Sequence, residues 1–549
     1  MSGSTRSRWS RTPARTSGRR AITTTTAALA ASALLLTACT GGADDEAADG
    51  SGGSDEVKIL VVKHALTRAM DEMAWVAELE KTAGVTITWE EVSADWDQKK
   101  STMLAAGDVP DLIIGPGAIT DSDLATFRSL FEDLSDDMDA LPNVAAMFDE
   151  VEGAKDMATQ ADGAVYALPT WKEFWPQSIT RQYVNQEWLD NLGLATPTTW
   201  DELYDVLLAF KEQDANGNGD PADEIPMDWA PVTTTGWGYF QPTALLGSVG
   251  LPIVGGGGTG YFVEDGEVGN FLADERWKEV LTFLNRAYEA GLVNPNVITQ
   301  DYSAYQSIGR GSGGTASVGF SWGWTASDRF GAQLAPQYAS IAPLAAEAGQ
   351  SEPLTWSYDF ENLTANHVVV SAQSTAKDAA LRVVDAFYGQ DMSVQVLFGD
   401  LGTHVTKVDD STYEVLPPAD GESDPSTWKW TSSLADFGPM WIRSDLDVTL
   451  PTDLAEAVEQ STVLAEAVAN VDPVEDVLPP YLKMTTEDLS TLALNNSAIL
   501  NLTQTKFAEF VTAGGIDAGW DDYVAQLERS GLTQNVELYQ KYYDEAVTG

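Results

Sequence analysis

The pattern of apolar and polar positions predicts alternating strands and helices in the first part of the folded chain. Residues 57–62 form a largely apolar run that is typical of a buried strand, whereas residues 85–89 alternate strictly between apolar and polar. Helical spacing connects the two over residues 67–83, and a short helix that carries Met103 leads to a further apolar stretch at residues 110–114. Strands that alternate with helices indicate an α/β fold with a parallel sheet covered on both faces.

The clearest helix start lies in the middle of the chain. Thr199 is a favourable N-cap residue, and Glu202 follows it at the spacing of a capping box. The apolar residues after it recur at helical spacing, which predicts a helix that ends in a polar loop beginning with Asp214. These apolar residues are Leu203, Val206, Leu207 and Phe210.

The remaining pattern predicts further strands and a helical C-terminal part. Residues 277–290 predict a helix that Gly291 ends, and residues 316–320 and 366–371 predict strands. Near the C-terminus, one helix has a single apolar face and ends before Gly531. That face consists of Trp520, Tyr523, Val524 and Leu527.

The length of the chain predicts at least two lobes. About 510 residues follow residue 38, which exceeds the roughly 250–300 residues at which a single core stops growing. We expect residues 57–165 to form the first segment of an N-lobe, and residues 363–430 to return to it. Residues 166–362 are expected to form a C-lobe. Residues 431–549 are expected to be a helical region that completes the C-lobe and the hinge.

The first 38 residues resemble a bacterial lipoprotein signal peptide. Six arginines precede any acidic residue, and an apolar run from about Ala27 to Leu36 is too short to span a bilayer. Residues 36–39 (Leu-Thr-Ala-Cys) resemble a lipobox, in which cleavage before the cysteine leaves a lipidated Cys39. This predicts a protein anchored at the extracellular face of the cytoplasmic membrane. An ordinary secretory signal with a chance cysteine is the alternative.

The composition then narrows the classes of partner. Residues 39–56 are small and acidic, which predicts a flexible tether. Removing residues 1–38 removes six arginines and no acid, which leaves 25 basic and 83 acidic residues and a formal charge of −58. Such a surface repels nucleic acid and anionic lipid, so contact with the membrane is expected through the lipid anchor alone. One cysteine permits no intramolecular disulfide, and the three histidines are too scattered for a zinc site.

An acidic loop carries the strongest local motif. Oxygen-bearing side chains alternate with small residues from Asp214 to Asp220, which suits a hard cation such as Ca²⁺ with its 6–8 oxygen ligands. The loop is not an EF-hand, because Ile225 occupies the position of the bidentate glutamate. A polar loop of Asx-turns without an ion is the alternative. The candidate ligands are Asp214, Asn216, Asn218, Asp220, Asp223 and Glu224.

Several segments, taken in order, resemble family 1 of the extracellular solute-binding proteins of ATP-binding-cassette (ABC) importers, and most closely the large lipoproteins associated with oligosaccharide uptake. Their order and spacing cover residues 57–549. The segments are MLAAGDVPD at 103–111, YALP at 166–169, WLDNLG at 188–193, PTTWDEL at 197–203, EAGLVNP at 289–295, KF at 506–507 and WDDY at 520–523.

The resemblance implies a two-lobe α/β fold of the periplasmic-binding-protein type II, with a ligand cleft between the lobes. Relatives in this family carry a similar Asp-x-Asn-x-Asn-Gly loop that binds calcium. Residues 221–222 are extra in this chain, which leaves the roles of Asp220, Asp223 and Glu224 open.

Aromatic side chains are the second candidate chemistry. The C–H face of a pyranose packs on a flat ring, and its hydroxyl groups need a few placed polar groups. Many of the 18 tryptophans lie beside Gly, Pro or Thr, although most aromatics in a chain of this size fill the core. The candidate ligand-binding residues are Trp171, Phe174, Trp175, Trp237, Tyr239, Trp322, Trp324, Trp356 and Asp359.

Together these patterns predict a monomeric, lipid-anchored protein that captures a carbohydrate, above all an oligosaccharide, and delivers it to ABC permease subunits. The protein is expected to perform no covalent chemistry. The carboxylates of Asp359 and Glu361 could instead belong to an exported glycoside hydrolase, but chance pairs are abundant among 83 acidic residues. The chain contains no Gly-x-Ser-x-Gly, P-loop or His-Glu-x-x-His motif. A sensor that presents its ligand to a membrane kinase is the other alternative.

Overall fold

A computed structural model describes most of the chain from residue 55 onward. The described residues are 55–174, 176–220, 222–232, 236–359, 362–417, 429–473, 475–479 and 481–548. The export signal, Cys39, nearly all of the expected tether and Trp175 therefore lie outside the described residues. Within the described residues, no helix is both long enough and apolar enough to cross a bilayer.

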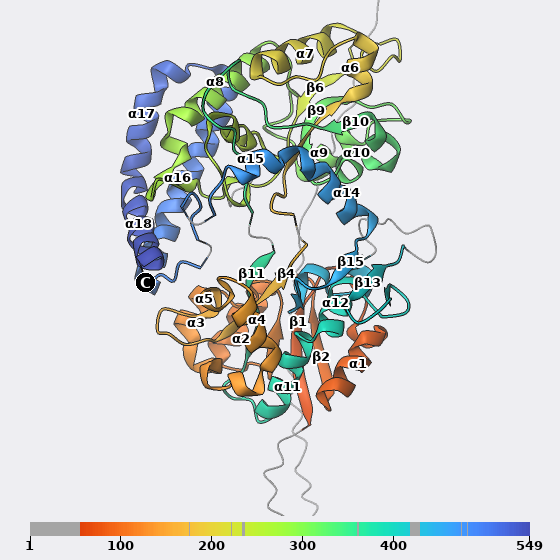
Figure 1. Cartoon of the computed structure of the whole chain (residues 1–549). Helices are drawn as coiled ribbons and strands as arrows, with labels where there is room; N and C mark the ends of the chain where they lie inside the picture. Colours follow the sequence, from red (N-terminus) through yellow and green to blue (C-terminus); the bar gives the residue numbers. More distant parts are fainter. Residues whose placement is uncertain are drawn as a thin grey trace, which may run out of the picture. The chain divides into compact units, whose positions relative to one another are not determined.

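A six-stranded sheet forms the centre of the first lobe, with the strand order β14-β4-β11-β3-β1-β2 (Figure 1). Strand β1 pairs in parallel with β2 and β3, and β14 pairs in parallel with β4, whereas β11 runs antiparallel to both of its neighbours. The strands are β1 (Glu56–Val62), β2 (Thr86–Val92), β3 (Leu112–Ile114), β4 (Ala167–Lys172), β11 (Leu363–Val370) and β14 (Trp441–Ile442).

Helices cover both faces of this sheet because side chains alternate along each strand. Ile59 and Val61 of β1 pack in one core with α1 (Ala74–Ala83), α11 (Lys377–Phe387) and α12 (Gln390–Phe398). Leu60 points the other way, into a second core with α2 (Trp96–Ala106) and α3 (Asp121–Phe127). The sheet is covered on both faces, as predicted, but it is mixed and not parallel, because β11 runs antiparallel to β3 and to β4. The helices α4 (Pro142–Glu150) and α5 (Ala154–Ala158) also pack in the first of these cores.

A four-stranded sheet with the order β10-β5-β9-β6 forms the centre of the second lobe. Its strands are β5 (Arg181–Asn185), β6 (Ile225–Asp228), β9 (Val318–Gly323) and β10 (Tyr338–Ser340). The helices α6 (Gln186–Leu192), α7 (Trp200–Glu212), α8 (Glu275–Glu289), α9 (Tyr302–Gly309) and α10 (Ala326–Leu334) belong to this lobe, as does the hairpin of β7 (Tyr261–Glu264) and β8 (Glu267–Asn270). One continuous core joins these elements.

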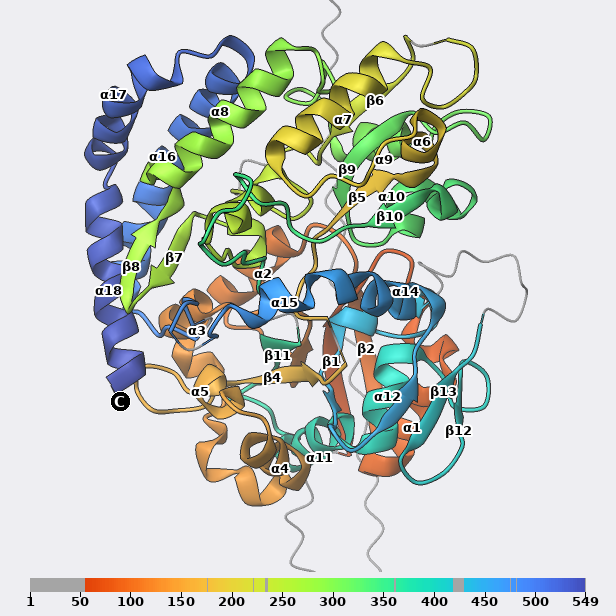
Figure 2. The ribbon, with the colours of Figure 1, turned by 45° about the horizontal axis from the view of Figure 1, so that its top comes forward.

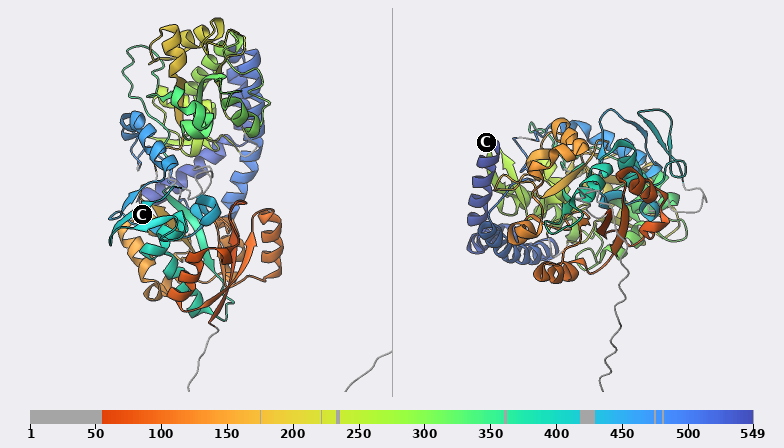
Figure 3. Two further views of the ribbon diagram at one scale, coloured as in Figure 1. Left: turned by 90° about the vertical axis from the view of Figure 1, so that its right-hand side faces the viewer. Right: turned by 90° about the horizontal axis from the view of Figure 1, so that it is seen from below.

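The C-terminal helices complete the second lobe. Helix α16 (Thr486–Ala513) lies beside α8, as Figure 2 shows. It is followed by α17 (Ile516–Arg529) and α18 (Leu532–Thr548), and Figure 3 draws these C-terminal helices in blue. The ring of Phe507 in α16 stacks on Trp277 of α8 with an interplanar angle of 12°. Trp520 and Tyr523 of α17 belong to the same core, so the predicted apolar face of that helix is buried.

A fully buried ion pair ties α10 to β6 within the second lobe. Arg329 donates to Asp228 Oδ2 over 2.8 Å, and both side chains are 0% exposed. Arg329 also donates to the hydroxyl of Ser321 in β9, while Asn294 and Gln300 donate to Asp228 Oδ1. Burial raises the pKa of Asp228, and the Arg329 charge opposes that shift. This network fixes α10 on the sheet.

Two further expectations differ from the structure. The helix expected over residues 67–83 begins only at Ala74, after a short 3₁₀ turn at Met70–Glu72. The ammonium group of Lys63 donates to the carbonyl oxygens of Thr67 and Arg68, so this segment is bound into the loop after β1. The expected boundaries also shift: β4 lies in the range expected for the C-lobe and β14 in that expected for the C-terminal region, but both strands belong to the first sheet.

Candidate functional site

The topology brings the strand ends of each sheet to one edge. In the first sheet, β1, β2, β3, β4 and β14 run in the same direction, so their carboxyl ends share an edge. In the second sheet, β5 begins where β6 and β9 end. Residues 173–180 connect the edge of β4 to the edge of β5. Open α/β sheets bind ligands at such carboxyl edges, so these two edges are the candidate binding site.

Two further connections run between the same edges. The segment from Trp356 to residue 362 returns to β11 in the first sheet. Residues 443–451 lead from β14 to α14 (Thr452–Ser461) and contain β15 (Asp447–Thr449), which joins β12 (Val405–Lys407) and β13 (Thr412–Val415) in a small sheet. In the described part of the chain, the first crossover comprises residues 173–174 and 176–180, the second comprises residues 356–359 and 362, and the third comprises residues 443–451.

Asp359 holds the first two crossovers together. Its carboxylate accepts hydrogen bonds from the backbone of Ile179 and of Gly255, each over 2.8 Å, and from the Ser357 hydroxyl over 3.0 Å. Its own backbone N–H donates to the carbonyl of Gln177. The side chain is 1% exposed. Asp359 is a predicted ligand contact, but the structure gives it a structural role instead, because its buried carboxylate links two crossover segments.

Arg181 lies at the centre of the crossover region. It is the first residue of β5, is 0% exposed, and donates to the carbonyls of Ser178 and Ile179 in the first crossover. It also donates to the Ala457 carbonyl and the Ser461 hydroxyl of α14. Burial lowers the pKa of Arg181 to about 10, so the guanidinium group stays charged at neutral pH.

Three of the predicted ligand-binding tryptophans are core residues. Trp322 is 0% exposed and meets Phe320 edge to face at 5.0 Å. Trp356 is 0% exposed and donates to the Thr180 carbonyl, and Trp237 is 2% exposed within a cluster of aromatic rings that includes Phe507. The prediction that these rings face a ligand is corrected, because packed neighbours cover them.

Four other predicted side chains are half-buried at or near the crossover edges. Trp171 is in β4 and Phe174 follows it, with the Phe174 ring stacked on Phe398. Trp324 directly follows the end of β9. Tyr239 precedes Phe240, whose backbone N–H donates to the Thr180 hydroxyl of the first crossover. The structure thus brings Tyr239 and Trp324 to the edge of the second lobe, and Trp171 and Phe174 to that of the first.

The first lobe also presents side chains that the sequence interpretation missed. Leu66 lies in the loop after β1 and is 50% exposed, although it is apolar. In the same loop, the His64 ring meets Phe437 edge to face at 6.0 Å. The sequence does indicate the position of this loop. The loop directly follows a strand predicted to end at Val62, and parallel strands place such loops at the binding edge.

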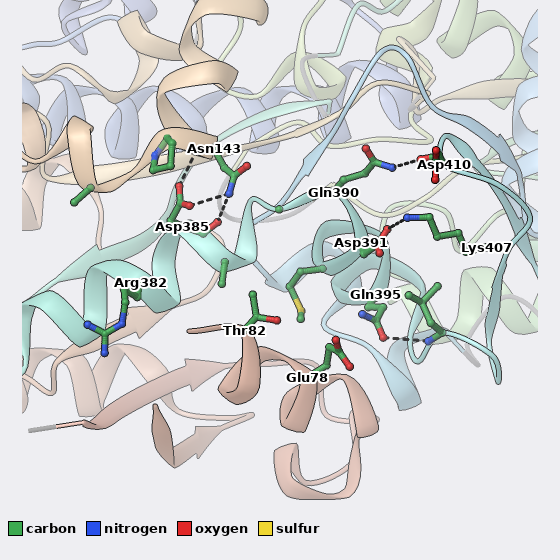
Figure 4. Close-up of a pocket in the computed structure, with 16 residues that line it drawn as sticks. Glu78, Thr82, Asn143, Arg382, Asp385, Gln390, Asp391, Gln395, Lys407 and Asp410 are labelled. Carbon is green, nitrogen blue, oxygen red and sulfur yellow. Dashed lines mark hydrogen bonds and ion pairs between the residues drawn. The ribbon is translucent and has the colours of Figure 1, made fainter. Parts of the chain in front are cut away.

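A separate pocket lies among the helices of the first lobe. It has a volume of about 660 Å³ and is lined by residues of α1, α4, α11 and α12 (Figure 4). Two of its carboxylates have partners: Asp385 accepts from the backbone and side-chain amides of Asn143, and Asp391 accepts from Lys407 over 2.7 Å. This pocket belongs to the helical layer on one face of the sheet and not to the crossover edge.

The acidic loop connects α7 to β6 in the second lobe. Asp214 Oδ2 accepts from the Gly219 backbone over 2.9 Å, and the amide groups of Asn216 and Asn218 donate to Asp223. Glu224 Oε1 accepts from two backbone N–H groups, and burial raises the pKa of Glu224. In the described part of the chain, no three His, Cys, Asp or Glu side chains form a metal-ligand group.

Two oxygen atoms of this loop nevertheless fit a cation. Asp214 Oδ1 and Glu224 Oε2 are buried and accept no hydrogen bond. A buried carboxylate oxygen without a partner is costly, and a bound cation would remove that cost. The donor set of carboxylates and side-chain amides is also the set that Ca²⁺ prefers. The chemistry of these donor groups therefore fits calcium, and Asp214 and Glu224 carry the two oxygens that have no other partner.

The sequence of the chain is similar to those of known binding proteins. A family model for bacterial extracellular solute-binding proteins matches residues 66–392. The chain is 28% identical over 502 residues to FusA of Streptococcus pneumoniae, a fructooligosaccharide ABC transporter substrate-binding protein, and this match covers 86% of the chain and 87% of FusA.

Solved structures of binding proteins superpose on this chain over nearly its whole length. An HMO-binding, ABC-transporter-associated solute-binding protein from Bifidobacterium longum infantis is 33% identical with a TM-score of 0.85, over 90% of this chain and 100% of that one. FusA in complex with kestose is 26% identical with a TM-score of 0.75, over 89% of this chain and 99% of that one. A second FusA structure is of an EF-hand mutant in complex with fructo-nystose.

Proposed function

Because the chain belongs to the bacterial extracellular solute-binding proteins, we propose that it captures an oligosaccharide between its lobes and delivers it to an ABC importer. As a member of this family it is a two-lobe binding protein and not an enzyme. The relatives that bind fructooligosaccharide, kestose or HMO support a carbohydrate ligand. Permease subunits in the membrane are the partners of this function, and a monomer suffices for it.

The observation that carries the carbohydrate proposal is the position of Trp324. This ring is half-buried at the end of β9, beside the crossover residues that Arg181 holds. An indole ring offers a flat apolar surface to the C–H face of a sugar, and nearby polar groups fix the hydroxyls. Tyr239 of the same lobe and Trp171, Phe174 and Leu66 of the other supply further apolar surface. The hinge closure that this fold permits would enclose the ligand.

We expect calorimetric titration of the purified protein to detect binding of at least one sugar from a panel of kestose, nystose, raffinose, maltotriose and lacto-N-tetraose. Trp324→Ala should weaken the affinity for that sugar about tenfold or more, because the stacking surface is removed. Tyr204→Ala, which changes a ring on the outer helix α7, should bind like the wild type. A wild type that binds peptides and no sugar would refute the substrate class, and an unaffected Trp324→Ala would refute the site.

Calcium is the second part of the proposal. We propose that the loop from Asp214 to Glu224 holds one structural Ca²⁺ ion, which neutralises carboxylates that would otherwise repel one another. The support is the pair of buried oxygens without partners, together with the EF-hand of FusA, a relative over most of the chain. The ion would stabilise the connection between α7 and β6 and takes no part in contacting the sugar.

Anchoring through Cys39 is the third part. The support is the lipobox-like segment at 36–39 after six arginines and an apolar run. A lipid anchor of more than one acyl chain would hold the protein stably at the membrane. Cys39→Ala should move the protein from the membrane fraction to the medium without changing its affinity for sugar. A variant that remains in the membrane fraction would contradict lipidation at this cysteine.

A further inference from the structure

Arg181 contacts the candidate ligand platform directly. Its guanidinium carbon lies 4.6 Å from the centre of the Trp324 ring, which is a cation–π contact. One of its N–H groups also donates to the Trp324 carbonyl over 2.7 Å. The Trp324 backbone is further held by the hydroxyl of Tyr183, which donates to the same carbonyl over 3.2 Å. Arg181 therefore contacts both the ring and the backbone of Trp324.

The same guanidinium group is bound to two elements of the crossover region. Its remaining N–H groups donate to Ser178 and Ile179 of the first crossover, at 3.1 and 3.2 Å. They also donate to the Ala457 carbonyl at 3.0 Å and to the Ser461 hydroxyl at 2.6 and 2.9 Å in α14, which follows the third crossover. The planar fork of arginine can satisfy these separate directions at once, whereas lysine cannot.

We propose that Arg181 is a positioning residue for sugar binding. It fixes the orientation of the Trp324 ring, and the positions of the first and third crossovers determine that orientation. A movement of either crossover displaces the guanidinium group, and with it the ring on which a sugar would stack. Stacking would then be strongest at one hinge geometry, so that the ligand favours that geometry over others. This inference rests on the proposed carbohydrate-binding function and extends it to a residue that need not touch the sugar.

A double-mutant cycle tests the inference by calorimetry, with the panel sugar that the wild type binds most tightly as the probe. Arg181→Lys alone should weaken binding about tenfold, because the charge remains but the ring is released. In the Trp324→Ala background, Arg181→Lys should have almost no further effect, since the ring that it orients is gone. The loss of affinity caused by Arg181→Lys would thus be about tenfold larger in the wild type than in the Trp324→Ala background, so the two substitutions would be non-additive. Full additivity would show that Arg181 acts only on the fold and would overturn the inference.

Arg276→Lys is the matched control. Arg276 also lies over an aromatic ring, that of Phe262 at 5.4 Å, and donates to Asp274 and Glu264, but none of these contacts is a crossover residue. This variant should bind like the wild type. Arg276→Lys that weakens binding as strongly as Arg181→Lys would contradict a specific role for Arg181.

Ser461→Ala provides a second route if Arg181→Lys does not fold. It removes one acceptor of Arg181 in α14 and leaves the guanidinium group and Trp324 in place. We expect a two- to fivefold loss of affinity that again disappears in the Trp324→Ala background. Absence of any loss would overturn the link to the crossovers. If the wild type binds no sugar, the proposed function fails and the inference fails with it, whereas a binding wild type without coupling refutes the inference alone.

Discussion

Replacing Arg329 with methionine should lower the free energy of unfolding by about 3–5 kcal/mol, because it leaves the carboxylate of Asp228 buried without its charge partner. Both side chains are fully buried, and Asn294 and Gln300 can satisfy only one of the two carboxylate oxygens. Urea unfolding followed by tryptophan fluorescence measures the effect. The loss should appear in the transition that reports the second lobe, since all of these residues lie in it.

Two variants separate the cost of the unpaired charge from the loss of side-chain contacts. Combining Arg329→Met with Asp228→Asn removes both charges and should restore part of the lost stability. Arg286→Met breaks a surface pair with Asp201, whose side chains are 48% and 79% exposed, and should cost about 1 kcal/mol or less. Equal losses in Arg329→Met and Arg286→Met would contradict the role assigned to the buried pair.

Chelation of calcium should lower the melting temperature of the purified protein by about 5–10 °C. An ion present at 100 times its dissociation constant stabilises the folded state by about 2.7 kcal/mol, and each kcal/mol shifts the melting temperature of a lobe of this size by about 2–4 °C. Asp214→Ala should already melt at the lower temperature and should not respond to the chelator, because one of the buried oxygens without a partner belongs to Asp214.

Asp409→Ala is the control for this experiment. Asp409 is an exposed Asx-turn carboxylate of the other lobe, which accepts from the backbone of Ser411 and Thr412. The variant should keep the full response to the chelator. A wild type whose melting temperature does not change after exhaustive chelation would argue against any calcium site in the loop.

Much of the fold follows from local patterns in the sequence. The strands predicted at residues 57–62 and 85–89 are observed as β1 and β2, and the apolar residues predicted after Thr199 are buried in α7. Thr199 also accepts from the Glu202 backbone as a cap should. The Glu202 carboxylate reaches one residue further back, where it accepts from the backbone N–H and the hydroxyl of Thr198. The family resemblance extended these local predictions to the two-lobe architecture, which the matched structures confirm.

The candidate site could be predicted less well, because strand ends decide which rings are exposed. Phe320, Trp322 and Trp324 lie at alternate positions and would share one face of β9. The strand ends at Gly323, so Phe320 and Trp322 are covered while Trp324 emerges at the edge. The sequence shows the alternation but not the end of the strand. Likewise, nothing in the local sequence of Arg181 or Asp359 reveals that distant crossovers meet at their side chains.

The order of strands in the first sheet has a consequence for biosynthesis. Strands β4 and β14 are neighbours, and the hydroxyl of Thr170 bonds to the backbone of Met440, 270 residues later in the chain. A growing chain cannot pair this edge of β4 until about four-fifths of its length has been synthesised. Contacts of such long range form slowly, because a large loop must close first. Until then β4 presents an open strand edge to other chains, so aggregation of nascent protein should begin there.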